Sequence, residues 1–300
     1  MLRGVALVLV ALFVGACGGA GGTSAPPSVA SAPSAETTQT PPAATVSTQP
    51  APSVEPSPAG ETWDLLWVSD STGSGGVPEA YAKRIEAAEG VTVRVRDGWT
   101  GSLQASSVLN ALRGTNGGML SSMGSGDFNL PDAVRDAEVI VISGGPGALP
   151  TLAACPPRLD PAASCGTAPS CGPELWAPLE ADLGAIFDEV FRLREGRPVI
   201  LRTHDWYLPW GPHDAWEACN ILESCVECAQ RQFSAAIHRV ASAHDVPVAS
   251  YMAAFNGPNQ DEALPSPWIK DDGVHPTAEG AEHLADVVAA LGFEPVTPPE

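Results

Sequence analysis

Apolar runs alternate with helical patterns from about Trp63 onward. Leu65–Val68 is apolar without polar alternation, which is typical of a strand buried on both faces of a sheet. The small polar residues of Ser69–Gly73 then favour a turn. Over Val77–Glu89 apolar residues recur at helical spacing. The stretch therefore predicts strand, turn and helix, with Ser71 on the turn.

The same alternation continues to the end of the chain. Further buried strands are predicted at Val91–Val95, Glu138–Ile142, Val199–Leu201 and Val246–Tyr251. Helices are predicted over Leu103–Leu112, Pro131–Asp136, Leu175–Arg194, Trp216–Ala243 and Thr277–Leu291, and loops over Gly114–Asn129 and Ala253–Lys270. Five strands alternating with helices indicate one parallel sheet covered on both faces, with right-handed crossovers. The pattern leaves the strand order open among doubly wound folds.

The first residues predict an export signal. Arg3 precedes an apolar run, Val5–Val14, which is too short to span a bilayer but suits a signal peptide. The run ends in Val-Gly-Ala-Cys, which looks like a bacterial lipobox, cut before the cysteine. We therefore predict a lipoprotein signal peptide over residues 1–16 and a lipid on Cys17. The alternative is an ordinary signal peptide followed by a chance cysteine.

Residues 17–60 consist mainly of Ala, Pro, Ser and Thr, and only Glu36 and Glu55 are charged. Such a segment has almost nothing to bury and is expected to be a disordered linker. It would tether a folded domain, residues 61–295, outside the cytoplasm on the bacterial cell membrane, with residues 296–300 as a tail. Residues 151–174 form a Cys- and Pro-rich insertion in that domain.

An even number of cysteines follows the lipobox, which in an exported chain indicates disulfides of open pairing. The six candidates are Cys155, Cys165, Cys171, Cys219, Cys225 and Cys228. Cys225 and Cys228 have the spacing of a redox or zinc pair. No second pair of that spacing occurs, so a structural disulfide is favoured.

The charge balance excludes two classes of partner. With 15 Lys and Arg against 35 Asp and Glu, the formal net charge is −20. Nucleic acid needs basic residues for its phosphates, and docking on anionic lipid needs them too. Contact with a membrane is therefore expected only through the N-terminal lipid, and we expect a monomer.

Candidate chemistry lies in the last loop. Asp272 and His275 are three residues apart, so one turn brings carboxylate and imidazole to the same side. A serine nucleophile needs this pair, because the imidazole removes its proton and the carboxylate orients the imidazole. The carboxyl ends of parallel strands share one sheet edge, so Ser71 is expected to meet His275. Alternatively, the serine turn only caps a helix and Asp-Gly only makes a turn.

These two blocks resemble the SGNH (GDSL-type) hydrolases, and the resemblance extends from about Trp63 to Leu291. Ser69-Asp70-Ser71-Thr72 is similar to the Gly-Asp-Ser-Leu element but lacks its leading glycine, and residues 272–276 match Asp-x-x-His-Pro. The resemblance implies a flavodoxin-like three-layer α/β/α sandwich with a five-stranded parallel sheet. It also implies that Ser71 is the nucleophile, His275 the general base and Asp272 its orienting carboxylate.

The oxyanion hole departs from the family pattern. The resemblance implies backbone donors at Ser71 and Gly101, and an Asn side chain from a Gly-x-Asn-Asp element. Here the third strand leads into Gly144-Gly145-Pro146-Gly147, without Asn, and Pro146 has no N–H. One donor is therefore missing, or the N–H of Gly145 or Gly147 replaces it. Losing one such donor costs roughly 3–4 kcal/mol in other hydrolases. The separate Gly-x-Ser-x-Gly fingerprint is absent.

A second polar cluster follows the fourth strand. We predict that His204, Asp205 and Trp206 line the substrate pocket. Together with His213 and Asp214, the first two also suit a divalent metal, which we regard as the weaker interpretation. Aromatic residues nearby favour packing under a loop over a platform for a sugar or acyl group: Trp206, Tyr207, Trp210 and Trp216.

The sequence thus predicts an extracytoplasmic serine hydrolase that cleaves carboxylic esters through an acyl-enzyme. Its substrate would be a small-molecule or glycan ester, with no metal or organic cofactor. Two alternatives stay open. One is a non-catalytic cell-surface binding lipoprotein on the same fold, and the other is a metal-dependent hydrolase built on His204 and Asp205.

Overall fold

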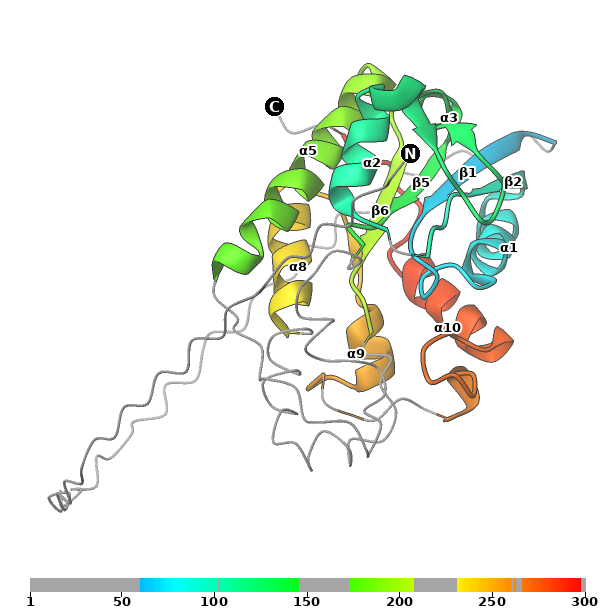
Figure 1. Ribbon diagram of the computed structural model, residues 1–300. Helices are drawn as coiled ribbons and strands as arrows, with labels where there is room; N and C mark the ends of the chain where they lie inside the picture. Colours follow the sequence, from blue (N-terminus) through cyan, green and yellow to red (C-terminus); the bar gives the residue numbers. More distant parts are fainter. Residues whose placement is uncertain are drawn as a thin grey trace, which may run out of the picture. The chain divides into compact units, whose positions relative to one another are not determined.

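The computed structural model describes residues 60–101, 103–145, 173–207, 231–260, 262 and 266–297. Its centre is one parallel sheet with the strand order β2-β1-β5-β6-β7 (Figure 1). The strands are β1 (Thr62–Val68), β2 (Thr92–Asp97), β5 (Val139–Ile142), β6 (Ile200–His204) and β7 (Val248–Ala249). This is the strand order of flavodoxin-like folds. The predicted five-stranded α/β sandwich is therefore confirmed.

Helices cover both faces of the sheet because its central strands are apolar on both faces. Leu65 and Trp67 pack under α1 (Val77–Glu89), α9 (Tyr251–Asn256) and α10 (Ala278–Ala289). Leu66 and Val68 pack toward the other layer. That layer consists of α2 (Ala105–Leu112), α3 (Leu130–Asp136), α5 (Ala177–Arg194) and α8 (Phe233–Ala243). Right-handed crossovers produce this division, since β2 is added on one side of β1 and the later strands on the other.

Two predicted loops contain regular structure, and one predicted strand is shorter than expected. Tyr251–Asn256 is helical because the Ser250 hydroxyl caps it, accepting from the Ala253 N–H at 3.3 Å, and because its apolar side chains are buried. This helix replaces the end of the predicted fifth strand, which is only Val248–Ala249. The predicted loop 114–129 holds a 3₁₀ turn, η1 (Thr115–Gly118), and a small antiparallel hairpin of β3 (Met119–Leu120) and β4 (Phe128–Asn129).

Several predictions fall outside the described residues. They are the signal peptide, Cys17, almost all of the linker and of the 151–174 insertion, the six disulfide candidates, Trp210, His213, Asp214, Trp216 and Gly147. At the other end of the domain, Val296 donates its N–H to the carbonyl of Val199 at 2.9 Å, so the chain still contacts the sheet where the tail was predicted to begin. Within the described part of the chain, no helix is long and apolar enough to cross a bilayer.

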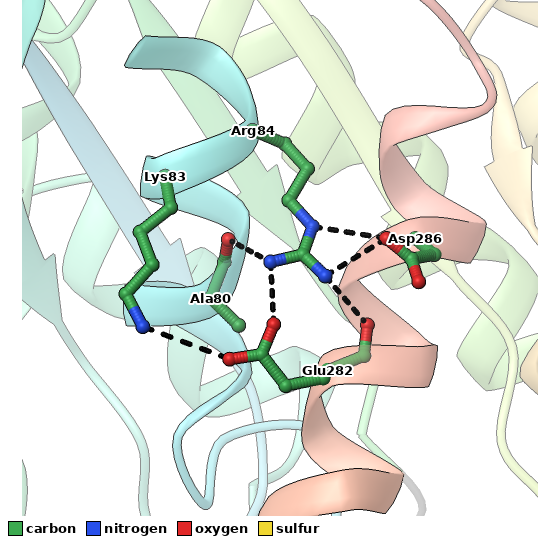
Figure 2. A network of polar contacts seen from close by, with 5 residues as sticks. All are labelled: Ala80, Lys83, Arg84, Glu282 and Asp286. Carbon is green, nitrogen blue, oxygen red and sulfur yellow. Dashed lines mark hydrogen bonds and ion pairs between the residues drawn. The ribbon is translucent and has the colours of Figure 1, made fainter. Parts of the chain in front are cut away.

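An ion-pair network joins α1 to α10, the helices that follow the two candidate catalytic segments (Figure 2). The Arg84 guanidinium donates to the carboxylate of Asp286 at 2.9 Å and to that of Glu282 at 2.5 Å. Lys83 reaches Glu282 only at 3.6 Å and is largely exposed. Arg84 is the better buried cation of the two, with 26% of its side chain exposed against 66% for Lys83. The network therefore depends on Arg84.

We expect Arg84→Ala to lower the free energy of unfolding by about 1 kcal/mol at low salt, the upper part of the range for exposed ion pairs. High salt should reduce the loss by screening the charges. Urea unfolding at two salt concentrations measures both effects. Lys83→Ala is the matched control and should change stability by only a few tenths of a kcal/mol. Equal losses in the two variants would contradict the dependence on Arg84.

Candidate active site

Asp70 shapes the turn that carries Ser71. Its carboxylate accepts hydrogen bonds from the Thr72 N–H at 3.0 Å, the Thr72 hydroxyl at 2.6 Å and the Gly73 N–H at 3.2 Å. The Trp206 indole donates in turn to the Thr72 hydroxyl at 2.5 Å. An Asp side chain that binds backbone groups two and three residues on is a common way to fix a tight turn. Ser71 is thereby held, half-buried, at the carboxyl end of β1.

The second segment is a loop that leads into α10. One carboxylate oxygen of Asp272 accepts from the backbone N–H groups of Val274, at 2.8 Å, and of His275, at 2.9 Å. The other oxygen lies 2.9 Å from Nδ1 of His275. Tyr207 also holds this loop in place, because its hydroxyl donates to the Val274 carbonyl at 2.8 Å. Burial raises the pKa of Asp272, but these backbone and imidazole hydrogen bonds outweigh it and lower that pKa to about 2.

The two segments meet. Ser71 Oγ lies 3.0 Å from His275 Nε2, although the residues are 204 positions apart. Since a carboxylate only accepts, Nδ1 of His275 carries a proton and donates to Asp272. Nε2 of the neutral ring is then an acceptor for the Ser71 hydroxyl. This is the order of contacts by which a serine is activated for nucleophilic attack.

The register of the sheet places the predicted oxyanion donors near the serine. Thr100 bridges Asp70 in parallel and donates its N–H to the Ser69 carbonyl at 3.1 Å, so Gly101 follows Thr100 just as Ser71 follows Asp70. On the other side, the loop after β5 brings Gly145 to the same edge. The Gly145 N–H, however, donates to Ser143 Oγ at 3.2 Å, so it is engaged within its own loop. Donation by either glycine to a substrate stays a prediction.

A second serine–histidine contact lies in the interior, and its serine is two residues before Ser71 in the chain. Ser69 Oγ is 3.0 Å from His204 Nε2, and both residues are buried. The other ring nitrogen, Nδ1, bonds the backbone carbonyl of Asp205 at 2.8 Å, not its carboxylate. Burial lowers the pKa of His204, which keeps the ring neutral. The ring is also stacked on Tyr251, with centroids 4.4 Å apart. This pair therefore lacks an orienting carboxylate and an open face, and we assign it to fixing β1 against β6.

The space around that pair leaves no room for a substrate. A Cβ on Gly73 would lie 2.1 Å from Ser69 Oγ and 2.8 Å from Cε1 of His204. Only glycine fits there, because the turn passes directly over the buried pair. The Ser69–His204 contact thus supports the turn that presents Ser71.

The structure gives His204, Asp205 and Trp206, predicted to line the pocket, interior positions instead. The Asp205 carboxylate is fully buried and accepts from the hydroxyls of Ser234, at 2.6 Å, and Ser250, at 3.0 Å, and from the Met252 N–H at 3.0 Å. Trp206 is 8% exposed. These residues join β6 to α8, α9 and the serine turn. Sequence spacing placed them after a strand but did not show that their polar atoms would be used internally.

The described residues hold no group of three His, Cys, Asp or Glu side chains that could bind a metal ion. Both ring nitrogens of His204 have protein partners, and the Asp205 carboxylate already accepts hydrogen bonds from hydroxyl and N–H donors. A metal at this pair would have to break these bonds.

Asp97, a buried carboxylate near the site, was not among the candidate residues predicted from the sequence. Its carboxylate accepts from the hydroxyl of Ser74 and from the N–H of Trp99, both at 3.3 Å. It thereby connects the loop after Ser71 to the loop that carries Gly101. Burial raises its pKa to about 6; the nearby charge of Glu79 adds to the effect, and the two hydrogen bonds oppose it. The only signal in the sequence was its place at the end of a strand, before Gly98.

The raised pKa of Asp97 predicts how the free energy of unfolding depends on pH. The unfolded carboxyl loses its proton near pH 4 and the folded one near pH 6, so the folded state holds more protons between these values. The contribution of Asp97 to stability therefore falls as pH rises from about 4 to about 6. Asp97→Asn removes this pH dependence. The difference in free energy of unfolding between variant and wild type should therefore shift in favour of the variant by up to about 2 kcal/mol from pH 4 to pH 7. Urea unfolding across this range measures the difference, and a difference independent of pH would contradict the raised pKa.

Comparison with known proteins leaves the family of the chain open. No protein-family model matches it, and no curated protein matches it. Among solved structures, it is similar to a two-domain esterase described as active on acetylated mannans, with 11% identity and a TM-score of 0.42. The match covers 80% of this chain and 54% of that one, so the chain spans about half the length of that esterase. At this level of similarity the match carries no argument about activity, which has to come from the site itself.

Proposed function

We propose that this protein is a serine hydrolase that cleaves carboxylic esters. The observation that carries the proposal is the continuous set of contacts from Ser71 Oγ to His275 Nε2, at 3.0 Å, and from His275 Nδ1 to Asp272, at 2.9 Å. The side chain of His275 is 37% exposed, so a substrate has access to the pair. The fold supports the proposal, since ligands of open parallel sheets bind at the carboxyl ends of the strands.

The geometry supports a two-step mechanism. Nε2 of His275 takes the hydroxyl proton as Ser71 Oγ attacks the ester carbonyl carbon. The resulting imidazolium is stabilised by Asp272 and gives its proton to the oxygen of the leaving alcohol, so that an acyl-enzyme forms. His275 then takes a proton from water, whose oxygen attacks the acyl carbon, and returns it to Ser71 as the acid leaves. Because the pKa of Asp272 is about 2, its carboxylate stays charged throughout.

Oxyanion stabilisation would come from backbone groups. The Ser71 N–H and the Gly101 N–H are the proposed donors, since these residues follow Asp70 and Thr100, which form a bridge just beyond the ends of β1 and β2. The loop after β5 offers the N–H of Gly145 in place of an Asn side chain. This N–H would first have to break its hydrogen bond to Ser143 Oγ. We therefore expect a lower rate than in a hydrolase with three free donors, by the roughly 10²–10³-fold that one donor contributes.

The first test is Ser71→Ala on 4-nitrophenyl acetate. We expect a loss of about 1,000-fold or more, because no other described hydroxyl lies at His275 Nε2. A fluorophosphonate probe, with the labelled residue located by fragment mass spectrometry, separates the two serines of the turn. Label on Ser71 supports the proposal. Label on Ser69 would show that the nucleophile belongs to the buried pair with His204. Equal turnover by Ser71→Ala and wild type would contradict the proposal.

The second test is Asp272→Asn. The amide oxygen can still accept the N–H groups of Val274 and His275, so the loop should keep its shape. The amide nitrogen cannot accept from His275 Nδ1, so the ring loses its orientation and charge stabilisation. We expect kcat to fall by at least about 100-fold with little change in KM, a smaller loss than at a buried triad carboxylate. An unchanged kcat would show that His275 does not depend on Asp272.

For the whole chain we propose an exported, lipid-anchored enzyme. The motif at Cys17 and the composition of residues 17–60 support this location. Palmitate labelling of the wild-type chain in a bacterial host, compared with Cys17→Ser, tests it directly, and equal labelling of both would count against the lipid anchor.

A further inference from the structure

A cavity of about 330 Å³ lies along α2 and extends to Thr100, the residue before Gly101. It is bounded by Thr100, Leu103 and Gln104, the adjoining face of α2, the η1 turn and β3. Its volume is at the lower end of the range for small-molecule sites, roughly 300–1,000 Å³. The size suits one compact group rather than a long chain.

The chemistry of the cavity wall is unusual for this protein. None of the lining residues is charged, although the chain carries a net charge of −20. Most are hydroxyl or amide side chains, including Gln104, Ser107, Asn110 and Asn116. Within the described part of the chain, the side chains of these four form no hydrogen bond with another protein group. The wall therefore offers uncharged donors and acceptors that are free to bind a ligand.

Apolar surface completes the cavity. Leu103 and Leu120 are buried beneath it, and Met119 is 48% exposed at its edge. A sugar ring combines hydroxyl groups with apolar C–H faces and so matches this mixture. An ionised ligand would find no countercharge among the lining residues, and an acyl chain would cover the free amides without pairing them, which is costly.

Two residues of the cavity wall contact the loops that carry the candidate site. Thr100 lines it and also bridges Asp70, the residue before Ser71. Leu103 lines it and contacts Gly145, because a Cβ on that glycine would lie 2.4 Å from the Leu103 carbonyl oxygen. The cavity wall thus shares Thr100 with the bridge to the serine turn, and Leu103 with the contact to the loop after β5.

We propose that this cavity binds the sugar ring of a neutral glycan ester, which makes the alcohol side of the substrate a carbohydrate. The proposal rests on the proposed function for its position beside Ser71. The ester oxygen would lie at the serine and the ring against α2. Ester cleavage would then release a free sugar hydroxyl and a short carboxylic acid.

Two neighbouring serines give a matched test. Ser106 and Ser107 are both exposed on α2, and only Ser107 lines the cavity. Ser107→Phe should obstruct the cavity, whereas Ser106→Phe adds the same side chain outside it. The substrates are 4-nitrophenyl acetate and partially acetylated neutral oligosaccharides built from glucose, xylose, mannose or N-acetylglucosamine.

We expect Ser107→Phe to lower kcat/KM for the preferred oligosaccharide by about tenfold or more, with less than a twofold change for 4-nitrophenyl acetate. Ser106→Phe should match wild type on both. Equal effects of the two variants, or an equal loss on both kinds of substrate, would overturn the sugar site.

A binding experiment keeps this inference separate from the proposed function. Ser71→Ala protein is titrated with the non-acetylated oligosaccharides and followed by calorimetry, with and without Ser107→Phe. Saturable binding that Ser107→Phe abolishes supports the sugar site even if no ester is cleaved. Absence of binding by every neutral oligosaccharide would overturn it, even if Ser71 hydrolyses simple esters. Preference for uronic-acid oligomers would equally contradict a neutral ligand.

Discussion

The candidate site depends on the parallel register of β1 with its two neighbours. Because Trp67 is level with Asp97 on one side and with Val141 on the other, all three strands end at nearly the same height. The loops that follow them therefore lie beside one another, and the loop after β7 reaches the same edge. This arrangement brings Ser71 and His275 to a distance of 3.0 Å across most of the domain sequence. A shift of one residue in either pairing would reverse the faces of the side chains and separate the loops.

The two serine–histidine contacts show how environment decides what the same pair of groups does. Both have an O···N distance of 3.0 Å. His204 is enclosed by aromatic rings and bonded to a backbone carbonyl, so a positive charge on it would have neither solvent nor a carboxylate partner. His275 is partly exposed and bonded to the Asp272 carboxylate, which would stabilise the charge that the proposed proton transfer creates. The buried pair holds a neutral hydrogen bond, and the outer pair has the surroundings that the proposed proton transfer requires.

Much of this arrangement followed from the sequence. The unbroken apolar runs of β1 and β5 predicted central strands, and the three-residue spacing of Asp272 and His275 predicted their contact. Helical periodicity identified α1, α5 and α10. Short elements were missed where local chemistry gave a mixed signal: α9 is a six-residue helix set by one Ser cap, and β3 and β4 are only two residues each.

The interior roles of His204, Asp205 and Asp97 could not be read from the sequence. A polar residue after a strand predicts the functional edge of the sheet, but it does not show whether the side chain turns toward solvent or into the core. Asp205 turns inward because Ser234 and Ser250 supply hydroxyl donors from two later elements. Asp97 turns inward because Ser74 and the Trp99 N–H meet it. These partners are brought together only by the complete fold.

The same close packing links the cavity to the loop after β5. Gly145 has a φ of 58° and presses on the Leu103 backbone so tightly that no side chain fits between them. Any displacement of Leu103 must therefore be shared by Gly145, whose N–H is held by a 3.2 Å bond to Ser143 Oγ. Leu103 therefore takes part both in the wall of the cavity and in the contact that positions the loop after β5, so one backbone segment sets the place of both.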